Sequence, residues 1–233
     1  MIFSESAVWG HRGWPSRFPD NTVAGIRAAA TVAEGVEIDI RRSADGRLVL
    51  SHDPEIAGHV VAESLWSGLA AISVDGHPAA VLADVLDVPV MLDLEVKNDP
   101  TEPGFDPTHR LAMDVAAHAR EGDVVTSFWW PSMDAIRASG SGAATGLLFE
   151  APVDPVAAIR HAVDHGHRSI APHHLLIHAS MMDTARTEGI EVVAWTVDDA
   201  HEAIRLAELG VAAIITNRPG ELIAEAPTVR DAT

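Results

Sequence analysis

The sequence has no cysteine among its 233 residues, and this absence excludes disulfide bonds, zinc–thiolate sites and cysteine nucleophiles. Its apolar runs fall far short of the ~18 residues that a membrane-spanning helix needs. The opening stretch MIFSESAVWG contains an acidic residue and no basic one, so it lacks the pattern of a signal peptide. A cytoplasmic location is therefore expected.

Basic residues are also scarce, since 16 Lys and Arg stand against 34 Asp and Glu and give a net charge of −18. Such a surface argues against nucleic acid and anionic membranes, which attract basic patches. A small anionic substrate remains compatible, because a metal ion and a few cations can reverse the potential of one pocket. The expected partner is thus a small molecule, with no nucleic acid and no stable membrane insertion.

Lysine is the scarcest charged residue, because Lys97 is the single lysine among the 16 basic residues. It lies in the stretch LDLEVKN, residues 92–98, which has the pattern of a buried strand. A buried lysine must pair with an acid or shift its pKa, and both are commoner at functional sites than elsewhere. The position of this one lysine therefore indicates a site.

Strand-like and helix-like segments alternate along the chain without a Ser/Gly-rich linker. This pattern predicts one α/β domain over residues 1–220, a somewhat irregular (β/α)8 TIM barrel. The expected strands are 7–10, 36–40, 48–51, 90–96, 124–128, 145–149, 169–171, 192–197 and 213–216. The expected helices are 22–33, 108–119, 132–139, 155–164, 179–187 and 199–209.

Nine expected strands compete for the eight places of such a barrel. Segments 36–40 and 48–51 are joined by only seven residues, too few for a helical crossover. Either a helix is missing there, or one of the two strands lies outside the barrel. Residues 53–89 are expected to form a short cap over the pocket after the third strand, and residues 221–233 a C-terminal tail.

Carboxylates gather on two expected strands near the end at which a barrel of this kind places its active site. The pairs Glu37/Asp39 and Glu95/Lys97 are two residues apart, so each pair faces one side of its strand. Three carboxylates pointing inward would be too costly to bury without a cation. Oxygen ligands favour a hard ion, Mg²⁺ or Ca²⁺, over zinc.

A series of short motifs between Val8 and Pro219 reads, in order, HRG, PDNT, EID, HD, LEVK, AWTVDD and IITNRP. The series resembles the glycerophosphodiester phosphodiesterase family, which belongs to the phosphatidylinositol-phospholipase-C-like phosphodiesterase barrels. No single tripeptide is specific, but the order of the motifs along almost the whole chain is. The resemblance implies metal binding by Glu37, Asp39 and Glu95, catalysis by His11 and His52, and phosphate or substrate binding by Arg12, Asn21, Lys97 and Trp195.

The activity that the resemblance implies is hydrolysis of glycerophosphodiesters to glycerol 3-phosphate and an alcohol, in lipid and glycerol metabolism, with one divalent cation. The chemistry agrees, because a phosphodiester needs its charge neutralised and two histidines can accept and donate protons. The resemblance also implies that the substrate's neighbouring hydroxyl attacks phosphorus before water does. A different phosphodiester, a lysophospholipid or a non-catalytic phosphate-binding role remain alternatives. A metal-dependent amidohydrolase is disfavoured, because Trp9-Gly10-His11 lacks the His-x-His of that class.

Two features lie outside the resemblance. Asp20 stands where the family usually has glutamate, and the cap sequence is short and atypical. The resemblance therefore says least about which substrate the pocket accepts. Six histidines between His161 and His178 include two pairs at helical i, i+4 spacing, which could hold a transition metal. Solvated histidine-rich helices are the simpler interpretation, and His173 is the member expected nearest to the pocket.

Overall fold

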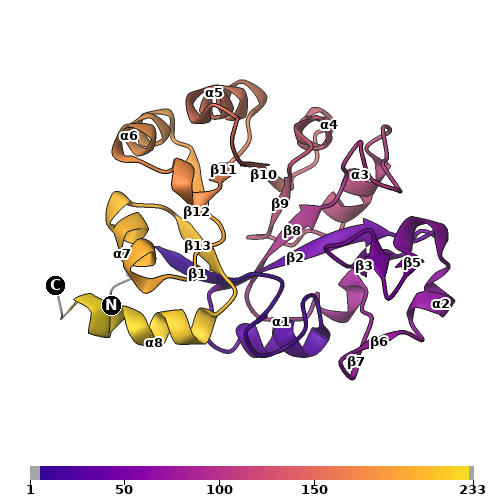
Figure 1. Cartoon of the computed structure of the whole chain (residues 1–233). Helices are drawn as coiled ribbons and strands as arrows, with labels where there is room; N and C mark the ends of the chain where they lie inside the picture. The colour runs from indigo at the N-terminus through magenta and orange to yellow at the C-terminus, as the bar shows by residue number, and fades with distance from the viewer. Residues whose placement is uncertain (1–5, 231–233) are drawn as a thin grey trace.

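The computed structural model describes residues 6–230, and eight parallel strands form a closed barrel in it (Figure 1). Closure is complete because β1 pairs with β13 on one side and with β2 on the other. The predicted (β/α)8 barrel is therefore confirmed. In order around the barrel the strands are β1 (Ala7–Gly10), β13 (Ala213–Thr216), β12 (Glu191–Ala194), β11 (Ser169–Pro172), β10 (Ala144–Phe149), β9 (Val124–Ser127), β8 (Met91–Val96) and β2 (Gly35–Arg42).

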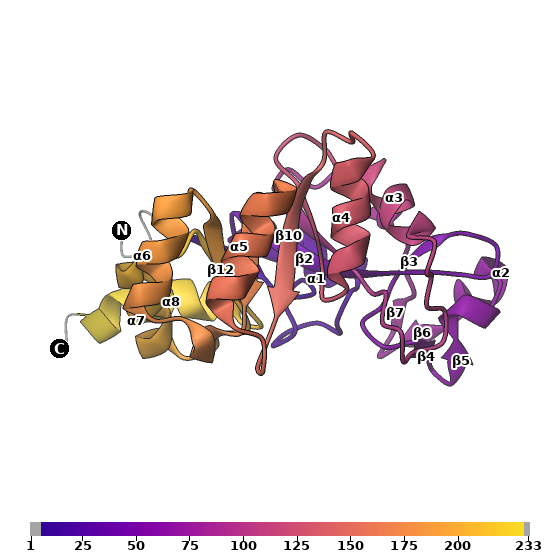
Figure 2. The ribbon, with the colours of Figure 1, turned by 90° about the horizontal axis from the view of Figure 1, so that it is seen from above.

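Helices cover the outer face of the barrel (Figures 1 and 2). Their ends carry ordinary signals: Asp154 and Asp199 accept hydrogen bonds from the first-turn amides of α5 and α7. Among residues 6–230 no helix is both long enough and apolar enough to cross a membrane. The helices on the barrel are α1 (Val23–Ala29), α3 (Arg110–Ala116), α4 (Trp130–Ala138), α5 (Pro155–His165), α6 (Ala179–Glu188), α7 (Ala200–Leu209) and α8 (Pro219–Arg230), with the short turn η3 (His174–Leu176) after β11.

The alternation of side chains along each strand divides the core into two layers. On β8, Leu92, Leu94 and Val96 belong to the large buried cluster that also contains the helix side chains. A smaller apolar cluster that includes Trp9 and Ile215 fills the barrel interior. Burying one leucine is worth about 1.5–3 kcal/mol, so the outward set anchors β8 while leaving Asp93 and Glu95 inside the barrel.

Strand β3 (Leu48–Leu50) explains why nine strands were expected. It pairs antiparallel with β2, with Ile40 opposite Leu50, and on its other side Val49 forms an isolated bridge to Val81 rather than pairing with a barrel strand. It therefore lies outside the barrel, and no helix is missing between it and β2. The second of the two alternatives open from sequence is the correct one.

The chain between β3 and β8 forms an insertion of small elements rather than one crossover helix. Figures 1 and 2 show it at the side of the barrel next to β3, away from α6 and α7. It contains two short hairpins that expose most of their residues. Its elements are β4 (Glu55–Ile56), β5 (His59–Val60), η1 (Val61–Glu63), α2 (Trp66–Leu69), β6 (Ser73–Val74), β7 (His77–Pro78) and η2 (Leu82–Asp84).

Of the segment expected as a C-terminal tail, residues 221–230 belong to α8, and residues 231–233 lie outside the described part of the chain. Glu221 accepts a hydrogen bond of 2.9 Å from the Trp14 indole, and Leu222 is fully buried. Gly220 lies against the same indole, where an added Cβ would come within 2.4 Å of the ring. Helix α8 therefore holds the loop after β1, which carries His11.

The histidine pair His174/His178 does not lie on one helix, although its spacing allowed that. His174 belongs to η3 and its Nδ1 lies 3.0 Å from Glu202 Oε1, whereas His178 caps the start of α6. Arg205 donates two further hydrogen bonds to the Glu202 carboxylate, at 2.7 and 2.6 Å. These contacts, led by the Arg205 hydrogen bonds, lower the pKa of Glu202 to about 2.

We expect Glu202→Gln to lower the free energy of unfolding by about 1–2 kcal/mol at pH 7, allowing for partial solvent screening. A carboxyl whose folded-state pKa is depressed stabilises the fold above its unfolded pKa. That contribution is lost as pH falls from about 4.5 toward 2, so the wild type and the variant should converge there. Urea unfolding at pH 7 and pH 3 measures this. Glu208→Gln, an exposed position on the same helix, is the matched control. Equal gaps at both pH values would contradict the assignment.

Candidate active site

Three buried carboxylates form the centre of the carboxyl end of the barrel. Glu37 and Asp39 come from β2 and Glu95 from β8, where Asp39 lies opposite Glu95 in the strand register. One oxygen from each lies within 4.8 Å of the others, and the three residues are 3, 0 and 6% exposed. The alternation predicted from sequence therefore brings these three acids together.

Two cations touch this acidic centre. Lys97 Nζ lies 2.9 Å from Asp39 Oδ1 and also pairs with Glu95, while Arg12 Nε lies 3.3 Å from Asp39 Oδ2. Burial opposes ionisation of Asp39, but Lys97 and Arg12 outweigh it and lower the pKa of this carboxyl. The single lysine of the chain thus lies within the acidic centre, as its position suggested.

The negative charges of the other two acids, Glu37 and Glu95, are less fully offset by neighbouring cations. Burial, together with the neighbouring carboxylate of Asp39, raises the pKa of Glu37 well above its usual range, and burial also raises the pKa of Glu95. Glu37 Oε1 is buried and has no hydrogen-bond partner among the described residues. A hard divalent cation fits this set, because it would satisfy that oxygen and offset the repulsion among three close acids.

His11 lies beside the acidic centre in a fixed orientation. Its Nε2 is 3.8 Å from Glu37 Oε2, and its Nδ1 is 2.7 Å from Asn217 Oδ1. Asn217 donates its amide N–H to Asp198 at 2.7 Å, which leaves Oδ1 to accept from His11. The network therefore assigns the neutral tautomer with the proton on Nδ1 and the lone pair on Nε2, toward the carboxylates. Burial, and next the Arg12 charge, lower the pKa of His11.

The turn after β1 is locally strained. A Cβ on Gly10 would meet the Gly13 carbonyl oxygen at 2.2 Å, and Arg12 and Asn21 have φ angles of 50° and 58°. In these left-handed conformations the Arg12 backbone N–H donates to Glu37 Oε2 at 2.9 Å. The Asn21 backbone N–H donates to the Arg12 carbonyl oxygen.

The side chains from this turn bind the acidic centre and one another. Asn21 donates to Asp39 Oδ2 at 2.7 Å and accepts from the Asp39 amide at 3.0 Å, so it fixes this acid from two sides. Asp20, where the family usually has glutamate, pairs with Arg12 at 2.9 Å. The shorter acid still reaches the arginine.

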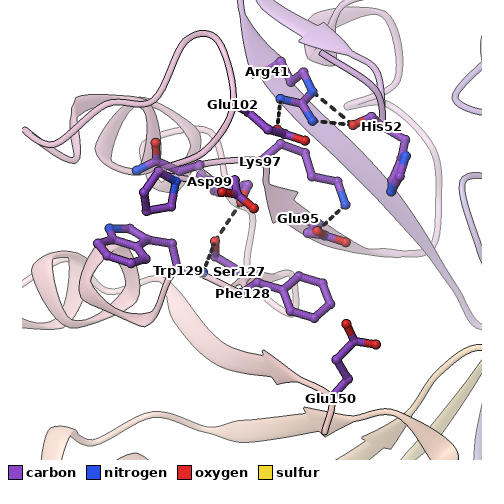
Figure 3. A pocket seen from close by; sticks show the side chains of 13 residues that line it. Arg41, His52, Glu95, Lys97, Asp99, Glu102, Ser127, Phe128, Trp129 and Glu150 are labelled. Atoms are coloured by element: carbon purple, nitrogen blue, oxygen red, sulfur yellow. Dashed lines mark hydrogen bonds and ion pairs between the residues drawn. The ribbon is translucent and has the colours of Figure 1, made fainter. Parts of the chain in front are cut away.

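His52 approaches from the far side of the acidic centre, after β3. Its Nδ1 lies 2.7 Å from Asp53 Oδ1, and its side chain is 42% exposed. Arg41 donates two hydrogen bonds to the His52 carbonyl, at 3.0 and 2.5 Å, and pairs with Glu102 at 2.8 Å (Figure 3). A buried arginine therefore fixes the backbone that carries this histidine.

A cavity of about 320 Å³ opens beside Lys97, and Figure 3 shows its polar and aromatic lining. His52, Glu95 and Lys97 form one side, and Phe128 and Glu150 stand across from them. The cavity therefore presents the Lys97 ammonium on one side and an aromatic side chain on the other.

Trp195 stands behind this aromatic wall. Its ring packs edge-on against Phe128 at 5.4 Å and against His173 at 5.2 Å, and its Nε1 donates to the Ala171 carbonyl. His173 therefore contacts Trp195, but it is not among the residues that line the cavity beside Lys97.

A neighbouring cavity of about 380 Å³ joins the site to the insertion. Arg12, Asn21 and His52 line it together with Ile56 and His77 of the small hairpins. The residues that line the cavity beside Lys97 include none from 53–89. The insertion thus borders the site through this second cavity.

Several residues of the site were not predicted from the sequence. Asp93 is a fourth buried carboxyl, bonded at 2.6 Å to Thr126 Oγ1, and burial raises its pKa to about 7. The sequence indicates this position, because Asp93, Glu95 and Lys97 are spaced two residues apart and so face the same side of the strand. Asn217 and Asp198 lie within quoted motifs, but only the closed barrel shows that Asn217 contacts His11 and that Asp198 holds Asn217.

An eight-stranded barrel whose carboxyl end gathers buried acids, two histidines and two cations has the architecture of a phosphate-cleaving barrel enzyme. Residues 11–221 match the Glycerophosphoryl diester phosphodiesterase family, and the chain belongs to that family. It is accordingly an enzyme of the phosphoric diester hydrolase class.

Individual relatives resemble the chain over nearly its full length. The glycerophosphodiester phosphodiesterase of Caldanaerobacter subterraneus subsp. tengcongensis is 23% identical over 239 residues, which are 94% of this chain and 97% of that protein. A glycerophosphodiester phosphodiesterase structure from Parabacteroides distasonis has a TM-score of 0.80 at 19% identity, covering 97% of this chain and 98% of the other. A phosphodiesterase from Oleispira antarctica in complex with the product sn-glycerol-3-phosphate has a TM-score of 0.79 at 19% identity, covering 93% and 95%.

Proposed function

We propose that the enzyme hydrolyses glycerophosphodiesters to glycerol 3-phosphate and an alcohol, and that it needs one divalent cation. The observation that carries the proposal is the convergence of three buried carboxylates with Lys97 and His11 at one point. The product bound to the Oleispira phosphodiesterase, sn-glycerol-3-phosphate, supports the same substrate class. The family match supports it as well.

The cation would be held by Glu37, Asp39 and Glu95, whose oxygens alone favour Mg²⁺ or Ca²⁺. When bound, such an ion neutralises phosphate charge. Arg12 and Lys97, which contact the two oxygens of Asp39, would add positive charge for the phosphate, while Asn21 keeps Asp39 oriented.

His11 acts as the base of the first step in this proposal. Its lowered pKa keeps it neutral near pH 7, and its lone pair lies on Nε2 toward the site. Nε2 takes the proton of the glycerol 2-OH, whose oxygen attacks phosphorus while the bond from phosphorus to the alcohol oxygen breaks. His52 gives its proton to the departing alcohol. A cyclic phosphate is left.

The second step reverses the proton transfers. His52 takes a proton from water, whose oxygen attacks phosphorus, and His11 returns its proton to the glycerol 2-oxygen as the ring opens. Both histidines are then restored, and one water has been consumed for each diester. Phe128, with Trp195 packed behind it, would form the face against which the carbon skeleton of the substrate lies.

The test is a panel of glycerophosphodiesters assayed with Mg²⁺, Ca²⁺ and excess chelator after dialysis. We expect turnover with at least one of the two ions and nearly none in chelator, because three close acids would otherwise repel the phosphate. Glu95→Gln should raise the metal concentration needed for half-maximal rate, since one anionic ligand becomes a neutral amide.

Undiminished turnover in chelator would overturn the metal requirement. Substrate binding without turnover under every condition would support the non-catalytic alternative, a phosphate-binding barrel. Hydrolysis of lysophospholipids alone would replace the proposed substrate class.

A further inference from the structure

A second cluster of metal-ligating side chains lies on the outside of the barrel, between helices α4 and α5. Asp134 comes from α4, and His161 and His165 occupy successive turns of α5. One ligand atom of each lies within 4.8 Å of the others. His167, just before β11, closes the cluster. The cluster is far from the catalytic end, because His167 precedes the amino end of β11 and Thr145, which it contacts, lies near the amino end of β10.

The imidazole rings of the cluster are already aligned. His161 and His165 stack with centroids 4.0 Å apart and planes 14° from parallel. The rings of His161 and His167 are within 3° of parallel. Two histidines one helical turn apart lie close enough to bind one ion once the rings tilt so that their lone pairs converge.

The hydrogen bonds fix which nitrogen of His165 is free. Its Nδ1 lies 3.0 Å from the His161 carbonyl oxygen, which can only accept, so Nδ1 carries the proton of the neutral ring. Nε2 then holds the lone pair, and it has no hydrogen-bond partner among the described side chains. The exposed ring is therefore a ligand in the required tautomer.

Asp134 is held as a carboxylate by two rings. Its Oδ1 lies 2.9 Å from His161 Nε2 and 3.0 Å from His167 Nε2. Burial opposes ionisation, but these hydrogen bonds outweigh it and lower the pKa of Asp134. The His167 side chain is fully buried and is fixed in turn by Thr145 Oγ1 at 2.7 Å. His167 therefore orients the acid from behind, as an outer-shell partner orients a metal ligand.

We propose that Asp134, His161 and His165 form a binding site for a first-row transition-metal ion, Zn²⁺ or Ni²⁺ in preference to Mg²⁺ or Ca²⁺, that joins α4 to α5. Two imidazole nitrogens and one carboxylate oxygen suit such ions, whereas the all-oxygen set of the barrel suits hard ions. On binding, the proton of the neutral His161 ring moves from Nε2 to Nδ1, and the freed Nε2 lone pair binds the ion. With bonds of ~2.1 Å, ligand atoms lie ~3.3 Å apart, so small rotations of the exposed His165 ring complete the site.

The experiment is equilibrium dialysis of the metal-free full chain against Zn²⁺ in excess Mg²⁺, with metal content measured per chain. The excess Mg²⁺ competes for the acidic centre of the barrel. We expect the wild type to bind one more zinc equivalent than His165→Ala, or to bind it at least ~10-fold more tightly. Asp134→Asn should show the same loss. Zinc should also raise the melting temperature of the wild type more than that of His165→Ala.

The matched control is His118→Ala. His118 is an exposed histidine after α3 whose Nδ1 contacts the Asp114 carbonyl one turn back, the same local hydrogen bond that His165 makes. This variant should bind zinc like the wild type. Equal zinc content, affinity and thermal shift in the wild type and His165→Ala would overturn the proposal and leave the cluster a hydrogen-bonded surface network. His165 is exposed and outside the core, so loss of folding does not obscure the comparison.

Discussion

Replacing Lys97 with methionine should lower kcat/KM by about 10²–10³-fold, the usual effect of removing one preorganised charge from a transition state. Lys97 Nζ pairs with Asp39 and Glu95, and the side chain lines the cavity while staying only 12% exposed. Methionine keeps most of the apolar length but removes the ammonium. The variant loses the charge that offsets two buried acids and, in the proposed mechanism, a cation for the phosphate. Initial rates over a range of substrate concentrations measure the effect.

Stability measurements separate a catalytic role of Lys97 from a structural one. Thermal unfolding of Lys97→Met should show a folded protein, because the outward side chains of β8 remain in the core. A variant that is largely unfolded but has normal specific activity in its folded fraction would make the lysine structural. Lys97→Arg is the matched charge-conserving control. It should recover only part of the rate, since a planar guanidinium does not occupy the space of a compact ammonium between Asp39 and Glu95.

The sequence predicted the parts of the site that depend on local geometry. Alternation along β2 and β8 sufficed to place Glu37, Asp39, Glu95 and Lys97 on the interior face, because strand side chains repeat every two residues. The barrel followed from the order of strands and helices. The same alternation places Asp93 on the interior face as well.

The features that sequence did not predict depend on contacts between distant segments. Asn217 reaches His11 only because β13 pairs with β1 when the barrel closes. Arg41 supports His52 through a carbonyl that β3 brings next to β2. Helix α8 has a weakly amphipathic sequence, and it is identifiable mainly from its packing against Trp14. None of these contacts has a fixed spacing along the chain.

The histidine pair should give the largest losses of all. His11→Ala and His52→Ala should each lower kcat by at least ~10²–10⁴-fold for substrates with an ordinary alcohol leaving group. The double variant should be scarcely worse than either single one, because residues that act as one unit are not additive. Additive losses in the double variant would indicate that the two side chains act independently.

The leaving group distinguishes the role of one histidine from that of the other. A nitrophenol needs no proton to depart, so a glycerophospho-nitrophenyl ester should restore most of the lost rate to His52→Ala. The same ester should not rescue His11→Ala, because the 2-OH still needs a base. Rescue of His11→Ala instead would exchange the two assignments. The assignment of His11 as the base of the first step rests on Asn217, which keeps the His11 lone pair on Nε2. Asn217→Leu should therefore impair the first step without removing either imidazole.

The substrate's own hydroxyl provides the last test of this chemistry. In a glycerophosphodiester whose 2-OH is replaced by hydrogen, His11 has no proton to take and no ring can form. Its turnover should fall to a small fraction of the rate of the parent compound, while the 2-deoxy compound still competes for the site. Rapid quenching of the parent reaction should also show the cyclic phosphate before glycerol 3-phosphate accumulates. If the 2-deoxy substrate is cleaved as fast as the parent, water attacks phosphorus directly, and His11 and His52 then serve a single displacement rather than two successive ones.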